Sequence, residues 1–116
     1  MFITICKSKI ANAVVTQTEL YYQGSITIDE KIIKAVDIIP GEKVDVLNIN
    51  NGVRIETFVI AGKSGSGAIC LNGPAARSGC VGDKLIILSY GFAEHKEAKD
   101  IRLKIIELDD RNHIKN

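Results

Sequence analysis

The chain has 116 residues, enough for one domain with one hydrophobic core and too few for two ordinary domains. Hydrophobic residues make up 46% of it, and a net charge of +1 gives no reason to expect a nucleic-acid partner. No apolar stretch approaches the roughly 20 residues that span a bilayer, and no basic segment precedes an apolar run at the amino terminus. We therefore expect neither secretion nor membrane insertion.

The three cysteines, Cys6, Cys70 and Cys80, form no CxxC pair and leave one thiol over in any disulfide scheme. This usage fits a reducing cytoplasm and predicts buried thiols. His95 and His113 show no metal-ligand spacing, so we expect both to face solvent and no metal to be bound.

Short β-rich runs bounded by glycine or asparagine dominate the chain, which predicts a mainly β protein. The predicted strands cover residues 2–6, 13–18, 25–28, 43–49, 53–60, 68–71 and 84–89, with a last strand at 101–108. Asn51-Gly52 supplies the positive φ angles of a tight turn and predicts a hairpin between the fourth and fifth runs. From Asp109 onward the sequence predicts a frayed tail.

Two short helices interrupt this pattern. Asp29 can cap the first, whose apolar residues share one face: Ile32, Ile33 and Val36. The second is predicted after Asn72-Gly73, with Pro74 at the first helical position, where its missing N–H costs the helix nothing. Residues 94–100 are charged and predict a further short helix or a loop.

The segments 41–46 and 82–87 both read glycine, acid, lysine, apolar residue, any residue, apolar residue. This echo indicates two similar half-units, although so short a match also arises by chance.

Gly24-Ser25 is the most informative dipeptide. Glycine leaves its carbonyl uncrowded and tolerates strained backbone angles, so the Ser25 hydroxyl could attack the preceding carbonyl carbon. Considered alone, the dipeptide is far more typical of an inert turn.

Further residues in a defined order and spacing extend this signal. With them, the chain resembles the self-cleaving, pyruvoyl-dependent aspartate 1-decarboxylases that make β-alanine, and the likeness runs from residue 1 to about residue 91. The residues that carry it are Tyr22, Gly24-Ser25, Ile28-Asp29, Asn51-Gly52, Arg54, Thr57 and Asn72-Gly73.

The resemblance implies a single domain over residues 1–116, folded as a six-stranded double-psi β-barrel with one or two short helices. Cleavage between Gly24 and Ser25 would leave a small chain, 1–24, and a larger chain, 25–116, whose first residue becomes a covalent pyruvoyl group. L-aspartate would form a Schiff base with that group and lose carbon dioxide, giving β-alanine for pantothenate and coenzyme A synthesis. Neither pyridoxal phosphate nor a metal would be needed.

The same resemblance implies a homotetramer with sites between neighbouring subunits, and leaves open whether maturation needs a partner protein. It assigns substrate binding to Lys9, Arg54, Thr57, Asn72, Gly73, Pro74 and Ala75. Three of them also have a structural alternative: Arg54 and Lys9 could be ordinary surface cations, and Thr57 could simply pack in its strand. Tyr22 lines the cleft or packs against neighbours, with nothing to choose between the two.

The chain departs from the family pattern at three positions. Phe58 stands where the family usually has a proton-donor tyrosine, Ala11 where a histidine is common, and Pro74 where an alanine N–H is usual. Phe58 cannot donate a proton, and loss of a general acid lowers turnover by about 10²–10⁴-fold unless another group replaces it. Two alternatives therefore stand beside the decarboxylase: a processed homologue with weak or altered activity, and a non-enzymatic β-barrel binding module.

Overall fold

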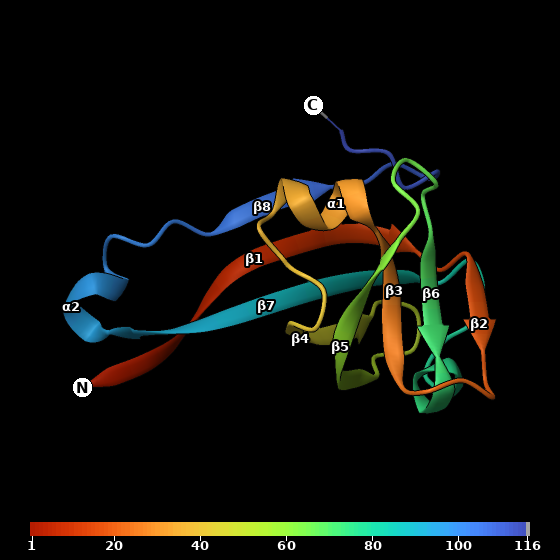
Figure 1. Cartoon of the computed structure of the whole chain (residues 1–116), viewed down its shortest axis with the longest axis horizontal. Coiled ribbons are helices and arrows are strands. Elements are labelled where there is room, and N and C mark those ends of the chain that lie inside the picture. The colour runs from red at the N-terminus through yellow and green to blue at the C-terminus, as the bar shows by residue number, and fades with distance from the viewer. Residues whose placement is uncertain (116) are drawn as a thin grey trace.

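A computed structural model describes residues 1–115 and contains eight strands, ordered β2-β6-β3-β5-β4-β7-β1-β8 (Figure 1). The elements in chain order are β1 (Phe2–Val14), β2 (Gln17–Glu19), β3 (Ser25–Asp29), α1 (Glu30–Ala35), β4 (Lys43–Asn48), β5 (Arg54–Gly62), β6 (Ile69–Asn72), the 3-10 helix η1 (Gly73–Arg77), β7 (Lys84–Glu94), α2 (His95–Ala98) and β8 (Lys104–Glu107). The mainly β prediction is confirmed, and the arrangement is consistent with a small β-barrel. The strand count exceeds by two the six that the resemblance implies.

The molecule has a body and an arm. β1 and β7 extend together beyond the other strands and end near α2, whereas β2, β3 and β6 lie at the opposite side (Figure 1). β1 and β7 pair antiparallel from Phe2↔Glu94 to Val14↔Lys84, with irregularities between Cys6 and Ser8 and between Ile10 and Ala13. The arm makes the molecule elongated, with extents of 42 × 30 × 24 Å.

β1 is longer than predicted, and the separate strand predicted at residues 13–18 is wrong. The polar run Lys7-Ser8-Lys9 ends the hydrophobic alternation in the sequence, yet Ser8 is fully buried because its Oγ donates a hydrogen bond to the Val36 carbonyl. Asn12, at φ 62°, then lies within the second irregularity. The chain leaves β1 after Val14 and forms the short strand β2 beside β6.

Other local predictions are confirmed. β4 and β5 form the predicted hairpin, in which Leu47 pairs with Arg54 across a turn that contains Gly52 at φ 76°. Asp29 caps α1, because its Oδ1 accepts from the Lys31 N–H at 2.9 Å. The Asp29 carboxylate also accepts from the Gly65 and Gly67 N–H groups, so the cap ties the loop after β5 to the helix start.

The two segments of the sequence echo adopt similar local structures. Gly41 and Gly82 both have positive φ angles, 89° and 95°, and a strand begins two residues later in each case. Those strands, β4 and β7, are antiparallel neighbours in the sheet. The echo therefore marks two equivalent strand entries.

The core consists of aliphatic side chains from the strands and from α1. Its members include Ile10, Ile26, Ile28, Ile32, Ile33, Val36, Val46, Ile69, Leu71, Leu85, Ile87 and Leu108. The three apolar residues predicted to share one helix face are all among them. α1 thus covers one part of the barrel interior.

The frayed tail predicted from Asp109 onward is wrong for the residues that the structure describes. Leu108 bridges to Ile114, and Asn112 is 2% exposed. The Asn112 amide accepts from the Val14 N–H and donates to the Val14 and Gly67 carbonyls, each at 2.8 Å. These bonds fasten the carboxyl-terminal segment to β1 and to the loop after β5.

The prediction of three buried thiols holds only for Cys70, because Cys6 is half-buried and Cys80 is exposed in the turn before β7. All three thiols are free. Within residues 1–115, the structure contains no helix with the length and apolar character needed to cross a membrane.

Candidate active site

Ser25 is the first residue of β3 and is completely buried, whereas Gly24 before it is exposed in the connecting bend. β3 lies between β5, to which it runs parallel, and β6, to which it runs antiparallel. The register places Ser25 opposite Asn72 at the end of β6. The residue predicted to act as nucleophile thus lies where the exposed bend enters the sheet.

The Asn72 side chain is hydrogen-bonded directly to Ser25. Its Nδ2 donates to Ser25 Oγ and to Thr27 Oγ1, both at 2.9 Å, and its Oδ1 accepts from Cys70 Sγ at 3.1 Å. Ser25 Oγ in turn donates a long bond of 3.4 Å to the Gln23 carbonyl. Because Asn72 is 3% exposed, this amide acts in a nearly dry environment, where hydrogen bonds have larger electrostatic effects.

Asn72 does not cap the helix that follows it. It occupies the N-cap position of η1, yet its side chain makes no capping bond because its amide is used by Ser25, Thr27 and Cys70. Pro74 is the second residue of η1, one position later than predicted, and the helix is a short 3-10 helix.

Gly73 lies closely against the segment before the bond predicted to be cleaved. Its φ is 64°, and a Cβ added there would lie 2.3 Å from the Tyr22 carbonyl oxygen and 2.9 Å from the Gly24 nitrogen. Gly24 has no positive φ, and a Cβ there would make an ordinary 3.6 Å contact with Pro74 Cδ. The backbone therefore requires glycine at 73, and does not require it at 24 in the uncleaved chain.

A pocket of about 420 Å³ opens beside the Gly24-Ser25 bond. Five residues singled out from the sequence lie along it, from three different segments of the chain. Its lining consists of Gly24, Ile55, Glu56, Thr57, Phe58, Pro74 and Ala75. The fold thus brings Thr57, Phe58 and the start of η1 to the bond predicted to be cleaved.

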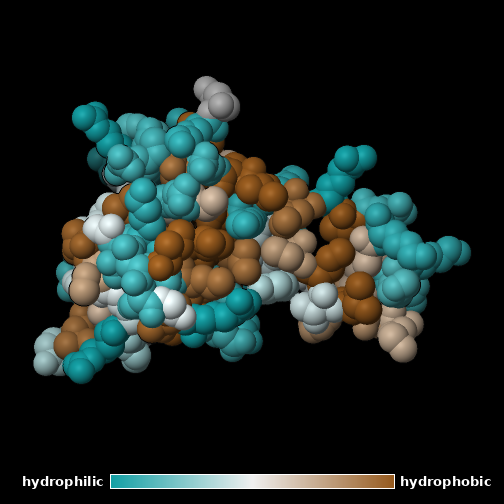
Figure 2. Space-filling model, turned by 180° about the vertical axis from the view of Figure 1, so that it is seen from behind, coloured by the Kyte–Doolittle hydropathy of each residue, from teal (hydrophilic) through white to brown (hydrophobic). Residues whose placement is uncertain are grey.

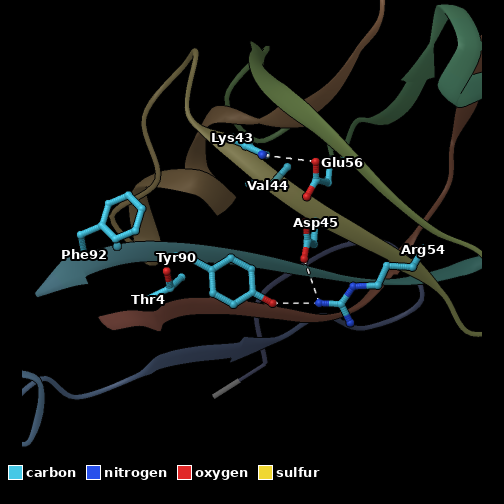
Figure 3. Close-up of a pocket in the computed structure, with 9 residues that line it drawn as sticks. Thr4, Lys43, Val44, Asp45, Arg54, Glu56, Tyr90 and Phe92 are labelled. Carbon is cyan, nitrogen blue, oxygen red and sulfur yellow. Dashed lines mark hydrogen bonds and ion pairs between the residues drawn. The ribbon is translucent and has the colours of Figure 1, made fainter. Parts of the chain in front are cut away.

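Arg54 points into a different pocket, of about 550 Å³, together with Asp45 and Tyr90 (Figure 3). Its Nη2 lies 2.8 Å from Asp45 Oδ2 and donates to the Tyr90 hydroxyl at 3.0 Å. The bond to Asp45 raises the pKa of Arg54, and burial raises the pKa of Tyr90. The guanidinium is thus held in place and charged before any ligand binds.

Two predicted substrate contacts are therefore separated from Ser25 within one chain. Arg54 does not line the pocket beside Gly24, although Glu56 lines both pockets, so the two are neighbours along β5. Lys9 lies on β1, paired with Leu88 and Ile105, outside the described lining of both. A second chain would be needed to place these cations at a Ser25 site if they do not move.

Other candidate residues are less involved. Tyr22 is exposed, so its side chain does not pack in the core, and only its carbonyl is placed against Gly73. His95 and His113 are exposed, as predicted. Among residues 1–115, no group of three or more His, Cys, Asp or Glu could hold a metal ion.

Sequence reasoning missed Cys70, Thr27, Asp45 and Tyr90. Cys70 and Thr27 lie at i−2 and i+2 from residues already singled out, Asn72 and Ser25, and in a strand that spacing places side chains on one face. This signal could have identified both. Tyr90 is brought to Arg54 only by the β5-β4-β7 order, for which the sequence has no local signal.

Comparison with known proteins gives a consistent result. Residues 1–115 match the model of a family described as aspartate decarboxylase. A protein of Listeria monocytogenes serovar 1/2a, named aspartate 1-decarboxylase, is 55% identical over 114 residues, which cover 98% of this chain and 90% of that protein. One of Leptospira biflexa with the same name is 49% identical over 116 residues, covering 99% and 98%.

Proposed function

This chain belongs to the aspartate decarboxylase family, and from that membership and the Ser25 site we propose that it is an aspartate 1-decarboxylase. It would convert L-aspartate to β-alanine and carbon dioxide, supplying β-alanine for pantothenate synthesis. The observation that carries the proposal is the buried Ser25 hydroxyl, which accepts a hydrogen bond from Asn72 beside a pocket shared by Gly24 and Thr57. Three free thiols support a cytoplasmic location.

We propose that the chain first cleaves itself between Gly24 and Ser25. Attack of Ser25 Oγ on the Gly24 carbonyl carbon breaks the amide bond and forms an ester, while the hydroxyl proton passes to the Ser25 nitrogen. Removal of the α-proton of residue 25 then expels the Gly24 carboxylate and leaves a double bond between the α and β carbons. Water finally replaces the nitrogen, which leaves as ammonia.

Asn72 and Thr57 would assist the first of these steps. A donor directed at Ser25 Oγ stabilises the oxygen as its proton leaves, because a hydrogen bond to the charged form favours that form. Thr57 lines the pocket beside Gly24, where a hydroxyl could donate to the oxygen that becomes negative when the carbonyl is attacked. Gly73 allows the start of η1 to approach the segment that must react.

The residues around Ser25 fit a pyruvoyl group formed in place, because Ser25 Oγ would leave with the Gly24 carboxylate, and the buried Asn72 N–H that it accepted from would become available to an oxygen of the new ketone or of its ligand. Such a ketone condenses with the substrate amine and accepts the electron pair left when carbon dioxide departs. Asn72, the start of η1 and Thr57 would hold the bound molecule, and Arg54 would bind a carboxylate through its bidentate fork.

We further propose that the complete site is shared between copies of the chain, in a homotetramer. Arg54 and Lys9 lie away from the pocket beside Gly24, and a second copy could bring them to it. Large apolar side chains are exposed on the arm, among them Phe2 and Phe92, and hydrophobic residues gather along the middle of the back face and on the arm (Figure 2). Exposed apolar surface of this kind typically marks an interface.

A second candidate function rests on Phe58, which lines the pocket beside Gly24 and carries no hydroxyl. In this alternative the chain matures but decarboxylates slowly, because no group at that position can return a proton to the carbanion. The two candidates agree on cleavage and differ in turnover. The non-enzymatic binding module predicts an uncleaved chain instead.

Intact mass spectrometry of freshly purified protein, followed by an assay of β-alanine formation, tests the proposal. We expect fragments 1–24 and 25–116, the second lighter than a simple hydrolysis product by one ammonia, together with decarboxylation of L-aspartate. Ser25→Ala, which removes only the nucleophile, should remain full length and inactive. A wild-type chain that stays uncleaved and without a ketone after prolonged warming would contradict the proposal and favour a binding module.

A further inference from the structure

Cys70 is a buried thiol that the proposed chemistry does not use. It lies on β6 two residues before Asn72, so both side chains occupy the same face of the strand. Its Sγ is 3.1 Å from Asn72 Oδ1, and the two residues are 8% and 3% exposed. Cys70 therefore contacts Asn72 on the side of the amide opposite to Ser25.

The partners of the Asn72 amide differ in their ability to accept a hydrogen bond. An asparagine amide has two N–H donors on one side and only acceptor lone pairs on the other, and the two sides have nearly the same shape. The Ser25 and Thr27 hydroxyls can either donate or accept, so they fit both orientations of the amide. A thiol is a better match for the carbonyl side, because sulfur accepts poorly and S–H can donate.

The surroundings of Cys70 keep it in the donor form. Burial raises the pKa of the Cys70 thiol, and the negative charge of Glu19 raises it further. At neutral pH the group therefore carries its proton and can donate to Asn72 Oδ1.

We infer that Cys70 is a positioning residue, which fixes the Asn72 amide with Nδ2 directed at residue 25. With the amide reversed, Oδ1 would hold the Ser25 hydroxyl proton and no N–H would support the oxygen as that proton leaves. The inference rests on the proposed function insofar as residue 25 is the reacting group.

Four variants distinguish the loss of the hydrogen-bond donor from a change in side-chain volume. Cys70→Val and Cys70→Ala remove the donor, Cys70→Ser keeps one, and Cys80→Val makes the same change at an exposed thiol as a matched control. The rate of self-cleavage is followed by intact mass spectrometry. Independently, the exchange of the Asn72 side-chain N–H hydrogens with water is measured by NMR in each chain.

We expect cleavage about three- to tenfold slower in the valine and alanine variants, the size that the loss of one neutral hydrogen bond predicts. The serine variant should stay within about twofold of wild type, and the Asn72 hydrogens should exchange at least about threefold faster only where the donor is missing. Wild-type cleavage rates in the valine and alanine variants, or equal slowing with serine, would overturn the inference. If the wild-type chain does not cleave, the proposed function fails, and unchanged Asn72 exchange would separately refute the role of Cys70.

Discussion

Gly73 connects the backbone of β6 to the bond that the chain is proposed to cleave. Its φ is left-handed, and a Cβ added there would lie only 2.3 Å from the Tyr22 carbonyl oxygen, so there is no room for a side chain. Gly82 has a similarly positive φ of 95°, but no atom lies within 4 Å of an added Cβ. Alanine substitution at the two glycines therefore distinguishes the free-energy cost of the backbone conformation from that of the steric contact.

Gly73→Ala should lower the free energy of unfolding by about 3 kcal/mol, since a left-handed alanine costs about 1–2 kcal/mol and the contact with Tyr22 adds to it. Gly82→Ala, as the matched control, should cost only the conformational part. Urea denaturation of the uncleaved chains, each carrying Ser25→Ala, measures both. Equal losses would show that the segment before Ser25 moves aside freely.

Phe58→Tyr tests whether a proton donor is missing from the pocket. The phenylalanine is 42% exposed in the lining beside Gly24, so a hydroxyl can be added without burying it. We expect kcat for L-aspartate to rise about tenfold or more, with KM little changed, because a general acid acts only in the transition state. An unchanged kcat in fully cleaved protein would mean that another group already supplies the proton.

At the scale of elements, the predictions fail where polar side chains are buried. β3, α1 and the β4-β5 hairpin follow alternation, capping and turn rules, and all were predictable. The length of β1 was not predictable, because the Ser8 hydroxyl donates to a carbonyl 28 residues away in the chain, and no local sequence pattern indicates such a partner. Asn112 is misleading for the same reason, since a polar residue near a chain end usually indicates exposure.

Asn112→Gly should release the carboxyl-terminal segment, because it keeps the left-handed backbone and removes the bonds to Val14 and Gly67. We expect a loss of about 2–4 kcal/mol of stability, at roughly 1 kcal/mol for each buried hydrogen bond. Limited proteolysis should then cut after β8 at least about tenfold faster than in wild type. His113→Ala, at the exposed neighbouring residue, is the control and should change neither quantity.

Glu42, directly before β4, links β7 and β1, because its carboxylate accepts from Ser89 on β7 and forms an ion pair with Lys7 on β1 at 3.0 Å. Burial raises the pKa of Glu42, but the hydrogen bonds from Ser89 and Lys7 outweigh it, so the pKa lies below its usual 4.5. A group whose pKa is lower in the folded state stabilises it above the unfolded pKa and loses that contribution as pH falls.

Stability should therefore decline as pH falls below 4.5, and Glu42→Gln should reduce that decline. Denaturation of both chains at pH 6 and at about pH 3 measures the effect, with the difference between them largest at the higher pH. Glu97→Gln, at an exposed glutamate on α2, should leave the profile unchanged. Parallel pH profiles for wild type and Glu42→Gln would exclude this role of the carboxylate.

At the scale of the whole molecule, Arg54 and Ser25 lie apart within one chain. The resemblance assigned both to one site, whereas the pocket that Arg54 lines and the pocket beside Gly24 are different cavities that share only Glu56. The sequence could indicate the residue types of the site, because they follow a spacing. It could not show which of them meet within one chain, because that depends on strand order and on assembly.

Mixing two inactive variants tests whether sites are shared. Ser25→Ala lacks the reacting residue and Arg54→Ala lacks the carboxylate clamp, so each alone should be inactive. If each site takes Ser25 from one chain and Arg54 from another, coexpression should restore about a quarter of wild-type activity, as random assembly of a symmetric oligomer predicts. Absence of any recovery in oligomers that contain both chains would place the entire site within one chain.

The position of the Gly24-Ser25 bond also changes the molecularity of folding. β1 and β2 precede the bond, yet β1 lies between β7 and β8, and β2 pairs with β6. Cleavage would leave 24 residues held only by noncovalent contacts, so that denaturation releases two fragments instead of one chain. The uncleaved precursor could refold at any dilution, whereas the mature protein would have to reassemble by a second-order reaction that slows as the solution is diluted.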